Sequence, residues 1–548
     1  MLDINLFRTG KGRRGDPELI RASQRGRFAS VNLVDEVIDL DAAWSRRQFE
    51  LDKLRQELNA ASKTIGKLRV RARDLSKKLV HGAEEIARRL AAMGAPAAEP
   101  EQDAECALAA TGDAANEPLP VGHDDVNLED EAKTLMDTMD EIKNTLAAKE
   151  AAAKEDGESN LELDKIGEEL NDAIARIAKL KIKQEEQVKK MTESTEEIKR
   201  LLAAKEAEVQ EAKAKLDATL MAIGNLVHES VPIGDDEANN AIVRTWGERR
   251  MEENLKNHVD LCRMLGIADS EKGAHVAGGR GYYLKEEGVM LNLALIMFGL
   301  NFLRKRGFKQ MQTPFFMRKE AMARCAQLAQ FDDELYRLAG DGEDKYLIAT
   351  SEQPMCAYHL GDRLHPDQLP VRYAGYSTCF RREAGSHGRD TAGIFRVHQF
   401  EKIEQFCITS PNGNDSWEML EEMIKNSEDF YKELGLPYRV VSIVSGALND
   451  AAAKKYDLEA WFPASRTFRE LVSCSNCTDY QARRLGIGYV QKKHDDPSKK
   501  FVHMLNSTLT ATERTICCIL ENYQKEDGVE VPKALQPFMG GVEFIPFQ

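Results

Sequence analysis

Apolar residues recur at alternating steps of three and four along two long stretches in the first half of the chain. This spacing is typical of helices that pack along a coiled-coil seam. It predicts one helix over about 36–90 and a second over about 160–224, where Gly224 ends it. The seam positions are Leu40, Trp44, Leu51, Leu54, Leu58, Ala61, Ile65, Leu68, Ala72, Leu75 and Leu79 in the first helix, and Val188, Met191, Thr195, Ile198, Leu202, Val209, Ala212 and Leu216 in the second.

The segment between the two helices has a different composition. Residues 91–130 are rich in Ala, Pro, Gly and acidic side chains and cannot bury enough apolar surface to order themselves, so we expect a disordered insertion there. A further helix is expected after it, through Leu135, Ile142 and Leu146. The long helices are expected to fold back as an antiparallel hairpin, each roughly 80 to 95 Å long. Such a hairpin is either an arm that reaches part of a large ligand or a dimerisation rod.

The second half of the chain has the pattern of a globular domain. One helix, over about 288–307, is apolar on most faces and is therefore expected to be buried. Short alternating runs follow it and predict strands, with helices only at about 414–434 and 509–524. This order predicts an α+β domain with an antiparallel sheet rather than a doubly wound parallel one. We expect an N-terminal domain over 1–230 and a second domain over 231–548.

Charged residues gather in one predicted hairpin, over 378–406. Arg381 and Glu383 end its first strand, while Lys402 and Glu404 lie on the second. Charges on strands cost free energy unless a ligand or a partner charge compensates for them. The pattern therefore indicates either cross-strand ion pairs on a solvated surface or a site for a small anionic ligand. The chain has neither GxxxxGK[ST] nor a strand-borne GxGxxG, so side chains would have to hold a bound nucleotide.

Composition and charge exclude some classes of protein. The 548 residues are 42% hydrophobic and 30% charged, and no run of about 18 or more apolar residues predicts a membrane span. No signal-peptide or transit-peptide pattern occurs at the N-terminus, so a cytoplasmic location is expected. Only Cys474 and Cys477 have metal-ligand spacing, and since no second pair completes a tetrahedral site, no zinc is expected. The net charge of −15 argues against a nonspecific nucleic-acid coat but allows local basic faces such as 69–73 and 77–78.

Three stretches of the second half form an ordered set. FKQMQTPFF ends a strand at Pro314, FRRE and GIFRVHQFEKIEQF flank a polar loop, and NSTLTATERTICC leads from a strand into a helix with Arg514. This set resembles the three motifs of class II aminoacyl-tRNA synthetases. With the helical hairpin, TSEQP at Thr350 and RELVSCSNC, the chain resembles the seryl-tRNA synthetases of the eukaryotic cytosolic type, except over about 85–160.

The resemblance implies an ATP-dependent ligase that makes seryl-adenylate and transfers serine to the 3′ end of serine tRNA, and of selenocysteine tRNA where one is present. It implies that Arg381, Glu383 and Arg514 are catalytic, and that Arg381 grips the ATP α-phosphate and the serine carboxylate. Glu470 and Ser473 would hold Mg²⁺, which prefers oxygen ligands. The residues implied to bind ATP are Arg381, Arg382, Glu383, Val397, His398, Gln399, Phe400, Glu470, Leu471, Val472, Ser473 and Arg514.

The resemblance also implies a serine pocket whose polar groups satisfy the amine and the hydroxyl of the substrate. Its residues would be Thr350, Glu352, Arg381, Glu404 and Asn506. Other implications are a homodimer built around Pro314, no membrane partner, and a tRNA whose long variable arm binds the helical hairpin. The loop 386–391 would cover the acceptor end of that tRNA.

Two other interpretations remain beside this one. The first is a non-catalytic, synthetase-like or coiled-coil interaction protein. The combined presence of Arg381, Glu383, Glu404, Glu470 and Arg514 argues against it, because a scaffold has no reason to keep them together. The second is a class II synthetase for threonine or proline, which the helical hairpin disfavours.

Overall fold

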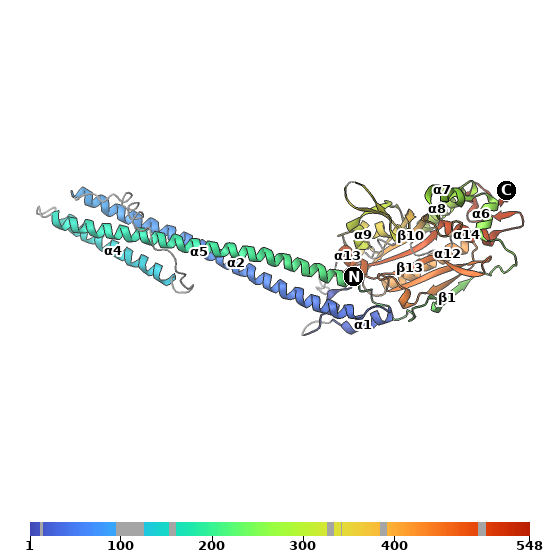
Figure 1. Cartoon of the computed structure of the whole chain (residues 1–548), viewed down its shortest axis with the longest axis horizontal. Helices are drawn as coiled ribbons and strands as arrows, with labels where there is room; N and C mark the ends of the chain where they lie inside the picture. The colour runs from blue at the N-terminus through green and yellow to red at the C-terminus, as the bar shows by residue number, and fades with distance from the viewer. Residues whose placement is uncertain are drawn as a thin grey trace. The chain divides into compact units, whose positions relative to one another are not determined.

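The computed structural model describes residues 1–10, 15–94, 125–152, 160–325, 334–340, 342–383, 392–490 and 500–548. Its contacts divide the chain into two compact units (Figure 1). One unit is Ala42–Ala214, which we call the arm unit. The other combines Met1–Asp41 with Lys215–Gln548, and we call it the sheet unit. The domain boundary expected near residue 230 stays a prediction.

Three helices build the arm unit (Figure 1): α2 (Asn32–Ala92), α4 (Asp125–Ala152) and α5 (Asn160–Met221). The ranges expected for the two long helices were about 36–90 and 160–224. Apolar side chains at the coiled-coil spacing are buried between α2 and α5, because only that face of each helix is shielded from water. They include Leu51, Ile65, Val209 and Ala212.

Helix α4 is the further helix predicted through Leu135, Ile142 and Leu146, and all three side chains are buried. They join a cluster that also contains residues of α2 and α5, so this part of the arm unit is a three-helix bundle. Ion pairs from Arg89 to Glu150 at 2.6 Å and from Lys143 to Glu85 at 2.7 Å tie α4 to α2. The helix begins inside the stretch expected to be disordered, and residues 95–124 of that stretch lie outside the described residues.

The sheet unit is built on an eight-stranded sheet. Every neighbouring pair is antiparallel except β4 and β9, which are parallel. The predicted α+β class with an antiparallel sheet is thereby confirmed. The strands are, in spatial order, β1 (Ala241–Trp246), β11 (Tyr438–Ser442), β12 (Lys454–Phe462), β13 (Thr467–Asn476), β15 (His503–Ala511), β10 (Gln399–Thr409), β9 (Val371–Phe380) and β4 (Lys309–Gln312).

Helices α8 (Glu287–Lys305), α12 (Asp415–Glu433) and α14 (Thr512–Tyr523) pack on one face of this sheet around the main hydrophobic core. Alternate side chains of a strand point to opposite faces, so Ile403 and Gln405 of β10 face these helices and their neighbours face the other way. Within the described residues, α8 alone is long and apolar enough to span a membrane by length and composition. Its burial against the sheet explains that hydropathy.

Shorter elements complete the sheet unit. The helices are α1 (Pro17–Gly26), α6 (His258–Leu265), α7 (Ser270–Ala277), α9 (Lys319–Cys325), α11 (Glu352–Tyr358) and α13 (Tyr480–Leu485). The small sheets pair β2 (Ala268–Asp269) with β3 (Tyr283–Leu284), β7 (Lys345–Leu347) with β5 (Phe316–Arg318) and β6 (Arg337–Leu338), β8 (Arg363–Leu364) with β14 (Gly488–Tyr489), and β16 (Gly528–Glu530) with β17 (Phe544–Pro546).

Candidate active site

A pocket opens on the sheet face that α8, α12 and α14 leave uncovered. It collects side chains from β10, β13 and β15, from the end of β9, and from the starts of α11 and α14. Twelve of the residues implied to bind ATP or serine line it: Thr350, Glu352, Arg381, Glu383, Val397, Phe400, Glu404, Glu470, Leu471, Ser473, Asn506 and Arg514. The charged positions of the predicted hairpin therefore belong to a concave site rather than to a flat solvated surface.

Arg381 lies where β9 ends. Its backbone N–H donates to the carbonyl oxygen of His398 at 2.9 Å, which fixes the start of the side chain. The guanidinium carbon is 5.5 Å from the ring centroid of Phe400. Its Nε atom is buried and has no hydrogen-bond partner within the described ranges. A planar, permanently charged group with an unused donor is suited to an oxygen of a phosphate or carboxylate.

Lys402 and Glu404 form a buried ion pair on the pocket side of β10. Their side chains are only 9% and 2% exposed, and Lys402 Nζ also donates to Thr508 Oγ1 at 3.3 Å. Burial, and secondarily the nearby carboxylate of Glu352, raise the pKa of Glu404, while Lys402 opposes that shift. The sequence left open whether Lys402 lies on a solvated face, and its burial excludes that alternative. The pleat of β10 places Phe400, Lys402 and Glu404 on one face.

The polar end of the pocket is organised around Glu352, in the first turn of α11. Its Oε1 atom accepts hydrogen bonds from Asn506 Nδ2 and from Gln481 Nε2, both at 3.0 Å. Thr350 lies two residues before it and is buried. Carboxylate, amide and hydroxyl groups thus converge with Glu404 around a space that suits a small polar zwitterion.

A β-bulge brings Glu470 to the pocket. Leu458 pairs with Val472 and the next residue pairs with Glu470, so Leu471 is an extra residue in β13. Partial desolvation tends to raise the pKa of Glu470, but the positive charge of Arg514 outweighs this effect, and the pKa is lowered. Arg514 Nη1 lies 3.7 Å from Glu470 Oε2. An ionised carboxylate and the hydroxyl of Ser473 are hard oxygen donors of the kind Mg²⁺ prefers. These residues fit the implied metal.

Aromatic and guanidinium groups form the remaining wall of the pocket. The guanidinium carbon of Arg514 is 5.0 Å from the ring centroid of Phe395, and Arg514 Nη1 donates to the carbonyl oxygen of Glu470 at 3.2 Å. Glu383 Oε2 accepts from Arg396 Nε at 2.5 Å. With Phe400 beside them, these groups present flat apolar and cationic surfaces of the kind that stack on a purine ring.

Some implied ATP-binding residues lie elsewhere. His398 and Gln399 line a neighbouring pocket, and the two pockets share Phe400. Arg382 is exposed, and Val472 is fully buried in the main core because it points to the helical face of β13. The loop 386–391, expected over the acceptor end of tRNA, lies outside the described residues.

Other pocket residues were not among those expected to bind ATP or serine. Lys402, Arg396 and Phe395 all line the pocket, and Glu513 lies at its edge beside Arg514. Strict alternation from Phe400 would have identified Lys402. No comparable signal marks Arg396 or Phe395, because they precede the strand in a segment without regular periodicity.

An antiparallel sheet with Arg381 at the end of β9 and Arg514 in the first turn of α14, directly after β15, is the arrangement expected of a class II aminoacyl-tRNA synthetase core. A family model described as tRNA synthetase class II core domain (G, H, P, S and T) matches residues 336–523, and one described as Seryl-tRNA synthetase N-terminal domain matches residues 1–112. With the full-length relatives described next, these matches show that the chain belongs to the seryl-tRNA synthetase family.

Relatives of this family match over the whole chain. A serine–tRNA ligase of Helianthus annuus is 54% identical over 547 residues, which cover 100% of this chain and 99% of the relative. A cytoplasmic serine–tRNA ligase of Arabidopsis thaliana is 54% identical over 551 residues, covering 100% and 97%. The cytoplasmic enzyme of Naegleria fowleri, solved in complex with AMP, has a TM-score of 0.71 and 42% identity, covering 100% of this chain and 99% of that one. The enzyme of Pyrococcus horikoshii, complexed with ATP, has a TM-score of 0.71 and 33% identity, with both chains covered at 100%.

Proposed function

We propose that this chain is a cytoplasmic ligase that activates L-serine with ATP and then transfers the seryl group to the 3′ end of serine tRNA. The observation that carries the proposal is the convergence in one pocket of Arg381, Arg514 and the polar group of Glu352, Glu404 and Asn506. The relatives complexed with AMP and ATP support ATP as the nucleotide.

In the first step the serine carboxylate attacks the α-phosphorus of ATP, and pyrophosphate leaves with the electron pair of the bond that breaks. Arg381 binds both the carboxylate and an α-phosphate oxygen, which holds nucleophile and phosphorus together. Such positioning is worth roughly 7 to 11 kcal/mol in favourable cases. The same charge stabilises the negative charge that grows on the phosphoryl oxygens. No proton transfer is needed, so His398 has no acid–base role.

Adenine lies between Phe400 and Arg514, with Glu383 accepting from its amino group. The ion pair of Glu383 with Arg396 holds that carboxylate in place. When Mg²⁺ is bound, it supplies positive charge to the phosphate oxygens of ATP. Glu470 and Ser473 would hold it through their side-chain oxygens.

Serine is selected by hydrogen bonds rather than by size. Glu404 and Glu352 receive the ammonium group and the hydroxyl, with Thr350 and Asn506 beside them. A pocket built to satisfy a hydroxyl rejects an analogue that lacks it, because its buried polar groups are then left unpaired. Lys402 limits the negative charge of this region, so two carboxylates can stay close together.

The homodimer is proposed to form through α8. Its outward stripe of Val289, Met290, Leu293 and Met297 is 39 to 50% exposed, although the opposite side of the helix is core. Exposed apolar stripes of this kind mark protein interfaces. Replacing Leu293 and Met297 by Glu is expected to give monomers in sedimentation velocity, whereas Leu201→Glu, an exposed leucine of the arm unit, should leave the dimer intact.

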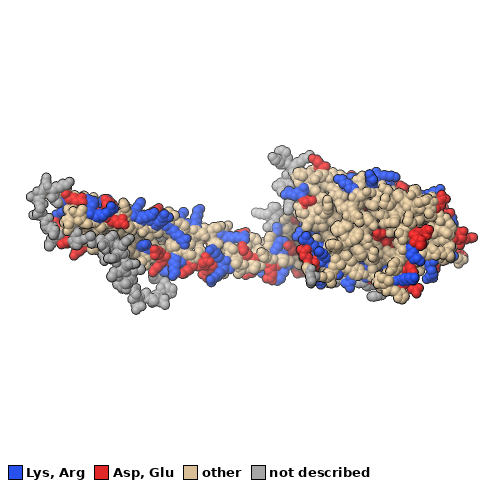
Figure 2. Space-filling model, turned by 90° about the horizontal axis from the view of Figure 1, so that it is seen from above, with Lys and Arg blue, Asp and Glu red and all other residues tan. Residues whose placement is uncertain are grey.

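The arm unit is proposed to bind the tRNA backbone by charge and shape. A groove between α2 and α5 is lined by Arg69, Arg73, Lys77 and Lys181, with a single acidic residue, Glu185. Basic residues are visible on the surface of these helices (Figure 2). Phosphate contacts of this kind supply salt-dependent affinity with little base reading. None of the described side chains of α4 lines this groove.

Serine-dependent exchange of pyrophosphate into ATP tests the proposal directly, because it needs only the first step. Serine should support exchange about a hundredfold or more better than alanine, given a pocket that pairs the hydroxyl. Equal rates with alanine or threonine would contradict the proposed specificity. Absence of exchange with every amino acid would favour the scaffold interpretation.

A further inference from the structure

Glu513 is a buried carboxylate to which the proposed reaction gives no role. It is the second residue of α14 and directly precedes Arg514, and its exposed fraction is 2%. It touches both the main pocket and the neighbouring one. A buried carboxylate is costly unless its hydrogen bonds are satisfied, so its partners identify what it holds.

The partners of Glu513 come from three separate segments. The backbone N–H of Glu401 donates to Oε2 at 3.0 Å and to Oε1 at 3.2 Å. The hydroxyl of Tyr282 donates to Oε1 at 2.8 Å, and that of Thr512 donates to Oε2 at 3.1 Å. The carboxylate therefore joins β10, the segment before β3 and the first turn of α14.

The bond to Glu401 has a consequence for the pocket. Glu401 directly follows Phe400 in β10, and Glu513 directly precedes Arg514 in α14. One carboxylate thus links the residue after Phe400 to the residue before Arg514. Phe400 and Arg514 both line the pocket, Phe400 from β10 and Arg514 from α14.

Thr512 also joins these two segments, because its Oγ1 donates to the carbonyl oxygen of Glu401 at 3.3 Å, but it does so through one atom, whereas Glu513 uses both carboxylate oxygens. The carboxylate of Glu401 is used on its other side, where Oε1 accepts from Tyr376 at 2.6 Å and Oε2 accepts from Asn292. The ion pair and hydrogen bond of Arg514 with Glu470 connect it to β13 instead.

We infer that Glu513 is a positioning residue that sets the spacing between Phe400 and Arg514, and so the width of the slot for the adenine ring of ATP. The inference rests on the proposed function, because it uses the adenine site assigned there. A stacked ring tolerates little change in this spacing, because dispersion attraction falls steeply when a gap of about 0.5 to 1 Å opens.

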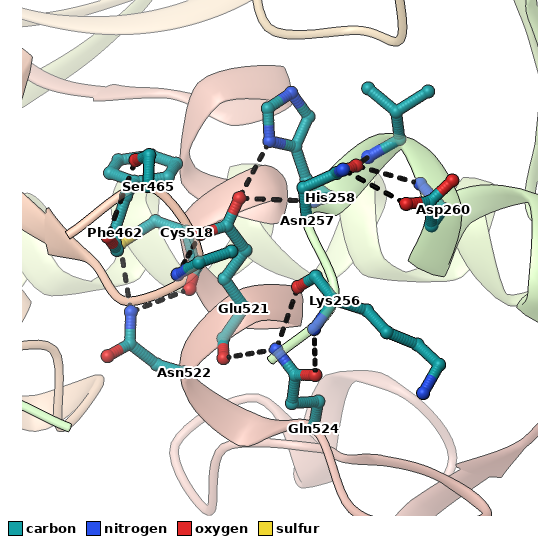
Figure 3. Close-up of polar contacts among 12 residues, drawn as sticks. Lys256, Asn257, His258, Asp260, Phe462, Ser465, Cys518, Glu521, Asn522 and Gln524 are labelled. Carbon is teal, nitrogen blue, oxygen red and sulfur yellow. Dashed lines mark hydrogen bonds and ion pairs between the residues drawn. The ribbon is translucent and has the colours of Figure 1, made fainter. Parts of the chain in front are cut away.

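The other end of α14 offers a matched control (Figure 3). There the buried carboxylate of Glu521 accepts from the backbone N–H of His258 at 3.1 Å, and His258 Nδ1 lies 2.9 Å from the same oxygen. Its second oxygen accepts from the backbone N–H of Ala464 at 3.1 Å. Glu521 thus anchors the same helix through buried backbone bonds, but it does not line the ATP pocket.

The test measures the Kd for ATP and the Kd for serine by titration calorimetry, with thermal unfolding, on the full chain. Glu513→Ala should weaken ATP binding roughly ten- to hundredfold, as misplaced binding groups do, and should change the Kd for serine by less than about twofold. Glu513→Gln keeps an oxygen that accepts from Glu401, so its Kd for ATP should return to within about threefold of the parent value. Glu521→Ala should lower the Tm and leave the Kd for ATP unchanged.

Glu513→Asp serves if the alanine variant does not fold, because its shorter side chain withdraws from Glu401 while keeping the charge. An unchanged Kd for ATP in that variant, equal losses for ATP and serine, or an equal loss in Glu521→Ala would each overturn the inference. Arg514→Ala tests the adenine site separately from the role of Glu513. If Arg514→Ala weakens ATP binding and the Glu513 variants do not, only the role of Glu513 is refuted. If Arg514→Ala also leaves ATP binding unchanged, the proposed adenine site is refuted as well.

Discussion

The sheet unit and the arm unit use opposite charges in different ways. In the sheet unit, Lys402 and Glu404 pair beneath a pocket, with side chains 9% and 2% exposed. In the arm unit, Arg55 of α2 pairs with Glu206 of α5 at 2.8 Å, with side chains 48% and 41% exposed. An exposed pair is screened by water and salt and contributes little, whereas a buried pair is costly to form and more costly to break. The effect of a substitution should therefore depend on burial more than on the distance between the charges.

The largest effect is expected at Arg381, where a half-buried cation meets the reacting groups. Arg381→Ala should reduce serine-dependent exchange by about a thousandfold or more, since it removes both positioning and charge stabilisation. Circular dichroism should show an unchanged fold. The exposed neighbour Arg382 is the control, and Arg382→Ala should keep most of the exchange activity. Comparable losses in both variants would refute the specific role of Arg381.

The buried pair itself is expected to show the next largest effect. Lys402→Met leaves Glu404 without its cation and should lower the free energy of unfolding by about 3 to 5 kcal/mol in urea titrations at neutral pH. The pKa of Glu404, already raised by burial, should rise further, so the loss should shrink at acidic pH where that carboxyl is protonated. The double variant Lys402→Met with Glu404→Gln should recover part of the loss. A single variant as stable as its parent would show that the pair is not buried in solution.

More of the arm unit than of the sheet unit could be predicted from the sequence. The long helices and α4 were predictable because one repeated spacing decides which face is buried, and Leu135, Ile142 and Leu146 carried that signal. The antiparallel sheet followed from alternation and from the scarcity of helices between strands.

The pocket was harder to predict because it depends on contacts between distant segments. The bulge at Leu471, which turns Glu470 toward the pocket, has no local signal in the sequence. The bond from Glu401 to Glu513 joins residues that are 112 positions apart. The sequence could not decide whether Lys402 is a surface residue, because its burial depends on Glu404 and on Thr508, which lies 106 positions away.

A third effect concerns pH, and only the sheet unit should show it strongly. Burial, with the nearby Glu401 carboxylate, raises the pKa of Glu513 from 4.5 to about 7, although hydrogen bonds from Glu401 and Tyr282 oppose the shift. The folded state then holds this proton more tightly than the unfolded state. The stability it contributes is complete below pH 4.5 and is lost as pH rises through about 7.

Glu513→Gln should remove this loss. Between pH 4.5 and pH 8, the unfolding free energy of the variant should gain roughly 3 kcal/mol relative to that of the parent. This figure follows from about 1.36 kcal/mol for each unit of the pKa shift. Urea titrations at several pH values measure it. Glu521→Gln is the control, and a difference that does not change with pH would show that Glu513 is already ionised in the folded state.

In the arm unit the expected effects are smaller and depend on salt. Arg73→Glu with Lys77→Glu should lower kcat/KM for aminoacylation of serine tRNA by about tenfold or more at low salt, because phosphate contacts are lost. Exchange without tRNA should not change. Lys53→Glu, on the same helix and outside the basic groove, is the matched control. A parallel loss of exchange, or an equal effect of Lys53→Glu, would place tRNA binding elsewhere.

The smallest effect is expected for the exposed pair of Arg55 and Glu206. A double-mutant cycle with Arg55→Ala and Glu206→Ala should give a coupling energy below about 1 kcal/mol, which 1 M salt should largely remove. The neighbouring pair of Lys205 and Glu50, at 3.0 Å across the same helices, should behave alike. A coupling of several kcal/mol that persisted in salt would mean that this surface is shielded from water, and burial would then no longer separate the two units.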